Sequence, residues 1–318
     1  MDTRALIDPE LLPVLEMLPS FEFSAQTLPE IRAGFAAQMT APEIEGLPPT
    51  DATAPGREGA PDVALVVFNP PSENRKRAAI LHIHGGGMII GTAAMSAATF
   101  SPLAPALDIV VVSVDYRLAP ETPFPGPQED CYAGLAWLFA NAETLGVDPA
   151  RIAVMGESAG GGLAAALAQM VRDRGDYTLC GQILIYPMID HRTGGDACPY
   201  RNPASGEFVW TRGSNRFGWE SLRGNYALDD DRIGWFSPTR AADLAGLAPT
   251  YIAVGMLDLF VDEDMDYARR LNVVGVPCEF HAYPGAFHAF DMMATARVAQ
   301  NAARNLRAAM ARLLGLPA

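Results

Sequence analysis

The sequence has no long apolar run. Its uninterrupted apolar stretches are all shorter than the roughly 20 residues that a helix needs to cross a bilayer. The first ten residues contain acidic side chains and a proline, where a secretory signal would need an apolar core. We therefore expect a soluble, cytoplasmic protein without a membrane partner.

Basic residues are also scarce. The chain has 23 Lys and Arg against 37 Asp and Glu, so its formal net charge is −14 at pH 7. A surplus of negative charge repels the phosphates of nucleic acids and the headgroups of anionic membranes. We expect no nucleic-acid partner.

Cysteine is rare as well. The four cysteines form no C-x-x-C pair and have no histidine pairs nearby; they are Cys131, Cys180, Cys198 and Cys278. Metal centres and disulfide frameworks need closer, patterned spacing. We expect reduced, mostly buried thiols, no metal and no other cofactor.

What the chain does contain is an alternation of apolar strands and helices. Its 318 residues are 49% hydrophobic and 19% charged, which is typical of a globular protein with a large core. Short apolar runs predict strands at 63–68, 78–83, 109–114, 152–155, 181–187, 250–255 and 278–283. Helical stretches separate most of these runs, so we predict an α/β fold with a mostly parallel sheet.

Two regions break this alternation. Residues 1–55 are rich in proline and acid, and two short helices are predicted there, Pro9–Leu18 and Pro29–Met39. Residues 191–238 contain no clear strand but many aromatic side chains, Trp210 among them. These are candidates to line a pocket, although most are expected to form a core of their own. We expect both regions to form a cap above the carboxyl edge of the sheet, where it would shape a pocket.

The most informative stretch is Gly156-Glu157-Ser158-Ala159-Gly160, which joins a predicted strand to a predicted helix. In this context, the pattern G-x-S-x-G places the serine on a sharp turn that exposes its hydroxyl. The two glycines remove side chains that would clash across the turn. Taken alone, the pentapeptide also occurs in packing turns and phosphate-binding turns.

A run of glycines follows another predicted strand, in His84-Gly85-Gly86-Gly87. Because glycine leaves its backbone N–H unshielded, this loop and the amide of Ala159 have the composition of an oxyanion hole. The run by itself is also compatible with a flexible loop. Its occurrence together with G-x-S-x-G favours the oxyanion hole.

A serine nucleophile needs a base, and the base needs an acid that orients it. Of the five histidines, only His288 lies in a glycine-containing loop after a strand and beyond Ser158 in the sequence. Asp258 follows the strand that ends at Gly255, so its side chain is expected at the same sheet edge as the serine. The order Ser158, Asp258, His288 resembles that of α/β-hydrolases. The further acids at 262–266 are explained by the preference of helix N-termini for negative charge.

Together these motifs resemble the hormone-sensitive-lipase-like esterases of the α/β-hydrolase fold. The resemblance rests on His84–Gly87, Asp115–Glu121, Gly156–Gly161, the segment that begins at Asp258, and His288. It runs from about residue 60 to the C-terminus and implies a mostly parallel sheet flanked by helices, with a helical cap.

The expected division of the chain follows from this resemblance and from the breaks in the alternation. It comprises N-terminal cap helices (1–55), a first part of the catalytic domain (56–190), a cap insertion (191–238) and a second part of the catalytic domain (239–318).

The resemblance also implies roles for single residues. A nucleophile, a base and an acid would form a catalytic triad: Ser158, His288 and Asp258. The backbone N–H groups of the oxyanion hole would come from Gly86, Gly87 and Ala159. The ring of His84 would brace the glycine loop.

The sequence departs from the family pattern in places. Met88 follows the glycines where the family often has an aromatic residue, which changes the expected shape of the pocket. The acid segment 258–263 reads D-L-F-V-D-E rather than D-P-L-R-D-E, and Ala289 follows His288 where glycine is usual. Glu157 is the variable residue of the turn, where it would tune the site's electrostatics or form a solvated or salt-bridged contact at the surface.

The predicted function is a serine carboxylesterase that hydrolyses short- to medium-chain acyl esters, its small-molecule substrates, through an acyl-serine intermediate. Two alternatives stay open: an amidase or deacetylase with the same machinery, and a non-catalytic small-molecule-binding protein on the same scaffold, as in the family's hormone receptors. The complete triad argues against the second alternative. Homodimers are common in the family that the chain resembles, but nothing in these residues alone establishes a homodimer here.

Overall fold

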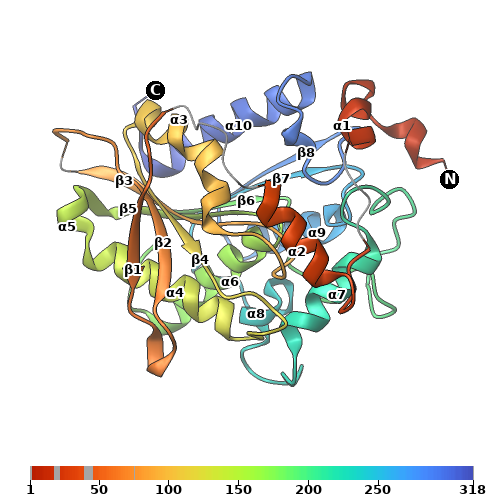
Figure 1. Cartoon of the computed structure of the whole chain (residues 1–318), viewed down its shortest axis with the longest axis horizontal. Coiled ribbons are helices and arrows are strands. Elements are labelled where there is room, and N and C mark those ends of the chain that lie inside the picture. Colours follow the sequence, from red (N-terminus) through yellow and green to blue (C-terminus); the bar gives the residue numbers. More distant parts are fainter. Residues whose placement is uncertain (1, 18–21, 39–45, 75, 318) are drawn as a thin grey trace.

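A mixed sheet forms the centre of the protein. The structure is a computed structural model that describes residues 2–17, 22–38, 46–74 and 76–317. In these residues the strand order is β1-β2-β4-β3-β5-β6-β7-β8 (Figure 1). The strands are β1 (Thr50–Ala54), β2 (Val63–Phe68), β3 (Arg77–Ile83), β4 (Val110–Asp115), β5 (Val147–Glu157), β6 (Gly181–Ile185), β7 (Thr250–Gly255) and β8 (Cys278–Tyr283). The β1–β2 and β2–β4 pairs are antiparallel, and the other pairs are parallel.

Helices cover both faces of this sheet (Figure 1). One face carries α3 (Ala97–Leu107) and α10 (Arg297–Leu314), and the other carries α4 (Gly126–Ala140), α6 (Ala159–Arg174) and α9 (Val261–Val273). Successive residues of a strand point to opposite faces, so Ala78 and Ile80 of β3 pack with the first group, and Ala79 and Leu81 with the second. Burial on both faces explains why these strands are continuous apolar runs.

The remaining helices connect or flank these layers. They are α1 (Leu12–Met17), α2 (Leu28–Gln38), α5 (Ala142–Leu145), α7 (Arg212–Arg223) and α8 (Ile233–Phe236). Short 3₁₀ turns occur at Thr3–Leu6, Pro9–Leu11, Arg57–Gly59, Ala93–Ser96, Pro238–Arg240 and Phe290–Met292. Within the part of the chain that the structure describes, no helix combines the length and apolar character that crossing a membrane requires.

The N-terminal segment is only partly what the sequence predicts. Both helices form, as α1 and α2, although their predicted ends at Leu18 and Met39 lie outside the described residues. Residues 50–54, however, are not part of a helical cap, because they form the edge strand β1, antiparallel to β2. Only Ala54 of this strand is buried, so it carries little of the apolar signal from which strands are predicted. The division predicted at residue 55 therefore assigned a strand of the sheet to the cap.

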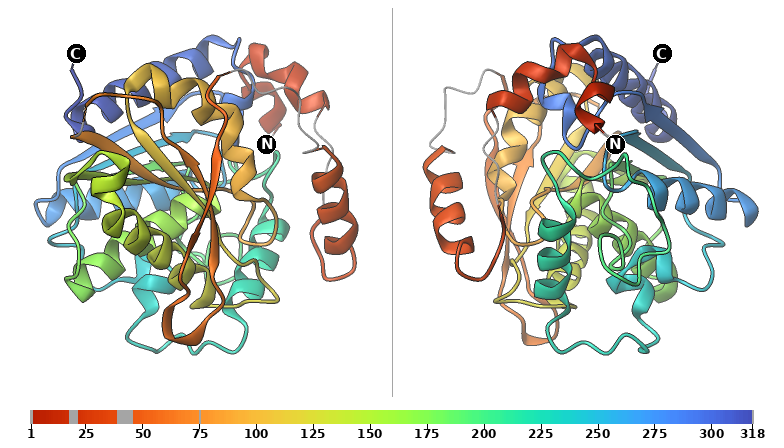
Figure 2. Two further views of the ribbon diagram at one scale, coloured as in Figure 1. Left: turned by 60° about the vertical axis from the view of Figure 1, so that its left-hand side comes forward. Right: turned by 90° about the vertical axis from the view of Figure 1, so that its right-hand side faces the viewer.

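The two N-terminal helices pack in different places. Leu11 and Val14 join the core cluster that contains α10, and Figure 2 shows α1 beside this helix. Leu28 and Ile31 of α2 join a separate cluster with residues of α7 and of the loop after β3. Only α2 therefore lies with the predicted cap.

The segment 191–238, all of which is described, contains α7 and α8 but no strand, as predicted. Trp219 and Phe236 are buried, and their rings make an edge contact with centroids 5.3 Å apart. The segment reaches the carboxyl end of the sheet, because a Cβ built on Gly218 of α7 would lie 2.8 Å from the oxygen of Gly87, just beyond β3.

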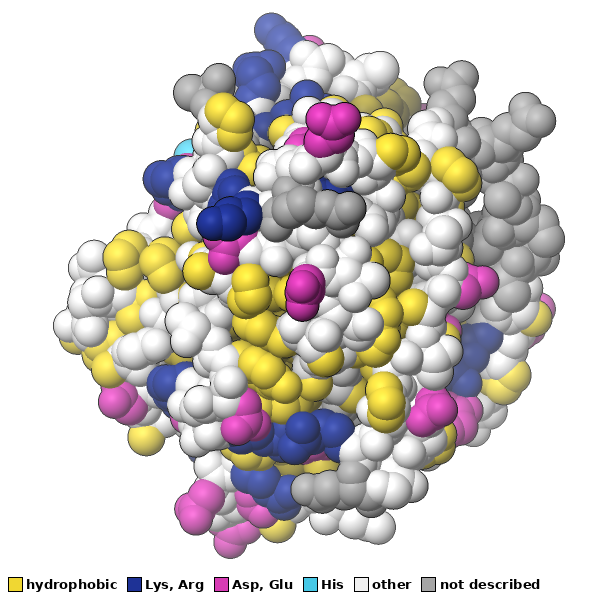
Figure 3. Space-filling view, turned by 90° about the vertical axis from the view of Figure 1, so that its left-hand side faces the viewer, with side chains coloured by type: hydrophobic (Ala, Val, Ile, Leu, Met, Phe, Trp, Pro, Cys, Tyr) yellow, Lys and Arg dark blue, Asp and Glu magenta, His cyan; other side chains and the backbone are white. Residues whose placement is uncertain are grey.

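Charge is mixed on the face of the molecule shown in Figure 3. Basic and acidic side chains lie next to one another there, among exposed hydrophobic side chains. The surplus of negative charge is therefore not gathered on this face.

Candidate active site

Ser158 lies on a sharp turn between β5 and α6, as predicted from the sequence. Its backbone has φ 55° and ψ −121°, a conformation that is strained for a residue with a Cβ. The turn is held by neighbouring backbone: the N–H of Ser158 donates to the oxygen of Ile185, and the N–H of Met188 donates to the oxygen of Ser158, both at 2.9 Å. Such a turn projects the serine hydroxyl from the carboxyl edge of the sheet.

The glycines of the turn are required by close backbone contacts. A Cβ on Gly160 would lie 2.0 Å from the oxygen of Ile83, and a Cβ on Gly156 would lie 2.3 Å from the oxygen of Gly160. Both distances are far below van der Waals contact. The turn can therefore form against β3 only with glycine at these two positions.

Ser158, His288 and Asp258 form one hydrogen-bonded chain. The Nε2 atom of His288 lies 2.9 Å from Oγ of Ser158, and its Nδ1 atom lies 2.7 Å from Oδ2 of Asp258. The second carboxylate oxygen of Asp258 accepts from the N–H of Phe260 at 3.0 Å. Asp258 is fully buried, and the residue exposures of Ser158 and His288 are 7% and 5%. Three side chains from the loops after β5, β7 and β8 thus meet in a site from which most water is excluded.

The glycine loop after β3 passes directly beside the serine. A Cβ built on Gly85 would lie 3.5 Å from Cβ of Ser158. Gly86 and Gly87 have φ angles of 113° and 60°, in the region that favours glycine, and the N–H groups of residues 89 and 90 both donate to the oxygen of Gly86 at 3.0 Å. The loop is therefore a fixed turn. Ala159, the other predicted contributor, is fully buried at the start of α6.

His84 lies under this loop. Its Nδ1 atom is 2.7 Å from the oxygen of Gly85, and its ring stacks on Tyr116 with centroids 4.2 Å apart. The hydroxyl of Tyr116 donates to the backbone oxygen of His84 at 3.0 Å. Burial lowers the pKa of His84 to about 4, so the ring is neutral at pH 7 and its Nδ1–H donates to Gly85.

His84 should therefore lower the free energy of unfolding as the pH drops from 6.5 to 4. Buried acids whose pKa is raised by burial act in the opposite direction; they are Glu263, Asp264 and Asp291. Over this range His84 takes up a proton in the unfolded chain, whose pKa is the ordinary 6.5, but stays neutral in the folded one. Its favourable contribution is complete above pH 6.5 and is lost towards pH 4, by about 3 kcal/mol. Urea titrations of the wild type and of His84→Gln across this range measure this contribution as the difference between the two curves.

The variant His84→Gln should reduce the loss of stability between pH 6.5 and 4 relative to the wild type. It should not abolish it, because burial also lowers the pKa of His191 to about 4, which acts in the same direction. Parallel curves for the wild type and His84→Gln would contradict the assignment to His84.

Glu157, the neighbour of Ser158, pairs with a histidine that the sequence did not single out. Its Oε2 atom lies 2.9 Å from Nε2 of His82, whose Nδ1 atom lies 2.9 Å from Oγ of Ser113. The structure shows a hydrogen-bonded contact of Glu157 that runs into the interior rather than across the surface. Ser113 is fully buried and His82 is 3% exposed, so this second Ser-His-Glu chain is closed to substrates. It ties the end of β5 to β3 and β4.

Three aromatic rings that were not among the predicted site residues surround His288. The centroids of Tyr186, Phe260 and Trp210 lie 4.9, 5.3 and 6.4 Å from that of the imidazole. The hydroxyl of Tyr186 donates to Oδ1 of Asp291 at 2.8 Å. Tyr186 follows β6 directly, and this place at the carboxyl edge is a signal that could have found it. Trp210 lies in a stretch without periodicity, where its aromatic character was the one signal that the sequence gave.

The cysteines are free thiols, but the prediction that most are buried is wrong. Cys131 is buried, whereas the other three are half-buried: Cys180, Cys198 and Cys278. Among the residues that the structure describes, no group of three or more His, Cys, Asp or Glu is placed to hold a metal ion.

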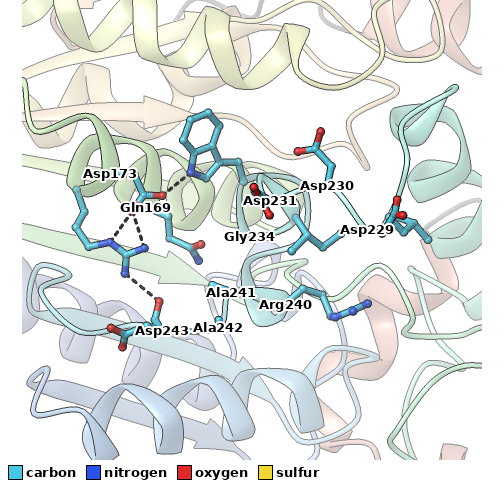
Figure 4. Close-up of a pocket in the computed structure, with 14 residues that line it drawn as sticks. Gln169, Asp173, Asp229, Asp230, Asp231, Gly234, Arg240, Ala241, Ala242 and Asp243 are labelled. Carbon is cyan, nitrogen blue, oxygen red and sulfur yellow. Dashed lines mark hydrogen bonds and ion pairs between the residues drawn. The ribbon is translucent and has the colours of Figure 1, made fainter.

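A pocket of about 460 Å³ opens elsewhere, near the C-terminal end of α6 (Figure 4). None of the predicted site residues lines it. Arg172 donates to Asp173 at 2.8 Å and to the backbone oxygen of Asp243 at 2.9 Å, and Nε1 of Trp235 donates to Asp173 at 2.7 Å. These contacts connect the lining residues to one another.

Comparison with known proteins places the chain in a family. Residues 80–292 match the family described as "alpha/beta hydrolase fold", and the chain belongs to this family. This finding confirms the predicted fold.

Two curated relatives and one solved structure are similar over most of their length. "Carboxylesterase NlhH" of Mycobacterium tuberculosis is 32% identical over 90% of this chain and 89% of its own. "Esterase LipI" of the same species is 31% identical over 91% of this chain and 89% of its own. The structure titled "Bacterial Heroin Esterase" is 38% identical and covers 98% of this chain and 99% of its own, with a TM-score of 0.88. The resemblance to esterases of this fold, predicted from the motifs, is thereby confirmed.

Proposed function

We propose that the protein is a cofactor-independent serine carboxylesterase. The observation that carries this proposal is the continuous hydrogen-bonded chain from Ser158 through His288 to Asp258, at the carboxyl edge of the sheet. The names of these three similar proteins, which describe esterases, support the same reaction class. Ser158 is the nucleophile, His288 the general base and Asp258 the acid that orients it.

The reaction proceeds in two halves. The Oγ atom of Ser158 attacks the ester carbonyl carbon while its proton passes to Nε2 of His288. The negative charge that develops on the carbonyl oxygen is held by backbone N–H groups of Gly86, Gly87 and Ala159. The imidazolium gives its proton to the leaving alcohol, and an acyl-serine remains. Water then repeats the sequence in reverse, with its proton moving to His288 and back to Ser158 as the carboxylic acid leaves.

The neighbouring residues keep this machinery in place. His84 braces the glycine loop from below through its contact with Gly85. Glu157, anchored to His82, fixes the end of β5 beside the nucleophile. The segment 191–238 and α2 act as a cap, because both pack on the loop that carries Gly87.

Hydrolysis of a graded series of p-nitrophenyl esters tests this proposal. We expect the highest kcat/KM with short to medium acyl chains and poor values beyond roughly ten carbons, because a closed site offers a pocket of finite volume. The low exposure of Ser158 supports a closed site. Measured alongside the esters, matched p-nitroanilides should react more slowly. A preference for the anilides would favour the amidase alternative, and no turnover of either series would contradict a hydrolase.

Labelling with a fluorophosphonate separates an enzyme from a binding protein on the same scaffold. An activated serine forms a covalent adduct, whereas an ordinary serine hydroxyl does not react. Mass spectrometry should find the adduct on Ser158. A chain that hydrolyses no ester and also stays unlabelled would be a binding protein.

A further inference from the structure

The indole of Trp210 lies beside the proposed reaction centre. A Cβ built on Gly87 would lie 2.2 Å from Cη2 and 2.7 Å from Cζ2 of this ring, so the indole rests directly on the glycine backbone. On the other side, its centroid lies 6.4 Å from that of His288. The ring therefore borders the space between the proposed oxyanion loop and the proposed base.

Buried contacts fix the orientation of this ring. Its Nε1–H donates to Oδ1 of Asn215 at 3.1 Å, and Nδ2 of Asn215 donates to the oxygen of Thr193 at 2.7 Å. Asn215 is fully buried, so this polar chain stays within the cap. The ring of Phe23 lies 5.5 Å from the indole. A change of rotamer would leave a buried amide oxygen without its donor, which is unfavourable.

The backbone around Trp210 is also constrained. Val209 has φ 63°, in the left-handed region that a β-branched residue rarely adopts. From α7, Gly218 approaches the oxygen of Gly87 so closely that a Cβ there would lie at 2.8 Å. The cap is thus docked on the glycine loop without a gap, and the indole has little room to withdraw.

We propose that Trp210 is a specificity-determining residue that limits the bulk of the ester around its reacting carbonyl. The inference rests on the proposed function. A bound ester must direct its carbonyl oxygen to the N–H groups of the loop and its leaving oxygen to His288, so its other atoms share the space that the indole borders. A branched or cyclic group there meets a ring that its contacts hold in place. Small ester groups fit beside the ring without contacting it closely.

The test compares Trp210→Ala and Trp210→Phe with the wild-type chain. The substrates are p-nitrophenyl acetate, pivalate and benzoate, together with acetates of linear and branched aliphatic alcohols. For each series we take the ratio of kcat/KM for a bulky ester to kcat/KM for the matched small ester. In Trp210→Ala this ratio should rise on the order of tenfold or more in at least one series, because the bulky group no longer meets the indole. Trp210→Phe should give a smaller rise.

Trp219→Phe is the matched control. Trp219 is a tryptophan of the same cap cluster, buried to 3% exposure, and its ring contacts are with His191 and Phe236. Its substitution should leave the ratio within about twofold. An equal rise in Trp219→Phe would mean that any loosening of the cap widens the site, and this would overturn the role of Trp210.

The remaining outcomes separate the two proposals. If the wild type and Trp210→Ala both hydrolyse acetate but the ratios in both series are unchanged, the specificity role is wrong while the esterase function stands. If Trp210→Ala does not fold, as judged by circular dichroism, an unchanged ratio in folded Trp210→Phe overturns the role and a raised ratio supports it. If the folded wild-type protein hydrolyses no ester, the proposed function itself fails, and the specificity role fails with it.

Discussion

Replacing Ser158 with alanine should lower kcat for ester hydrolysis by about a millionfold, the loss seen when a triad serine is removed from an enzyme of this kind. The reason is chemical, because without Oγ no acyl-enzyme forms and the reaction reverts to direct attack by water. The proposed oxyanion N–H groups remain in this variant, so a residual rate above that of the uncatalysed reaction should persist. Initial rates and fluorophosphonate labelling measure the loss.

The fold should survive this change. The hydroxyl of Ser158 is hydrogen-bonded to His288, and its removal leaves the strained backbone of the turn as it is. Ser113→Ala is a matched control, because Ser113 also bonds to a histidine ring, His82, but is sealed in the core. That variant should keep activity within about tenfold, the rate equivalent of 1.4 kcal/mol. A fluorophosphonate adduct that still forms on the Ser158→Ala chain would show that another residue is the nucleophile.

The central sheet could be predicted because strands that are buried on both faces are apolar runs in the sequence. β4 and β7 are mostly apolar, and both lie within a residue of their predicted ranges. β1 could not be predicted in this way. It is an edge strand with one buried residue, Ala54, and its pairing with β2 is specified by backbone hydrogen bonds rather than by apolar side chains.

The residues of the candidate site also differ in whether the sequence could predict their positions. Ser158, Asp258 and His288 each follow a predicted strand, and parallel strands bring their carboxyl ends to one edge, so chain order was enough to predict that they meet. Trp210 belongs to a stretch with no regular period, and its contact with Gly87 depends on how α7 docks. The pairing of Glu157 with His82 likewise depends on the rotation of side chains at neighbouring strand ends. Contacts of this kind are set by tertiary packing and leave no local pattern.

Replacing Asp258 with asparagine should lower kcat on the order of 10³–10⁴-fold. The carboxylate holds Nδ1–H of His288 at 2.7 Å, which directs Nε2 towards Ser158 and stabilises the imidazolium that forms when the serine loses its proton. An amide that turns its NH₂ group to Nδ1 favours the wrong tautomer, and it carries no charge to support the imidazolium. Steady-state kinetics on a short-chain ester measure the effect, with circular dichroism as the check on folding.

The variant Asp264→Asn is the matched control for this prediction. Asp264 was expected to be an ordinary acid of a helix N-terminus, but it is fully buried, and neither of its carboxylate oxygens has a partner among the described residues. Burial raises the pKa of Asp264 well above its usual range, and the charges of Glu263 and Asp258 raise it further. A neutral carboxyl group at this position resembles an amide, so Asp264→Asn should change kcat by less than about tenfold, a difference of about 1.4 kcal/mol. The same substitution at two buried aspartates of one segment should thus lower kcat strongly at Asp258 and only slightly at Asp264. If Asp264→Asn were the damaging change and Asp258→Asn nearly wild type, the proposed triad would contain the wrong acid.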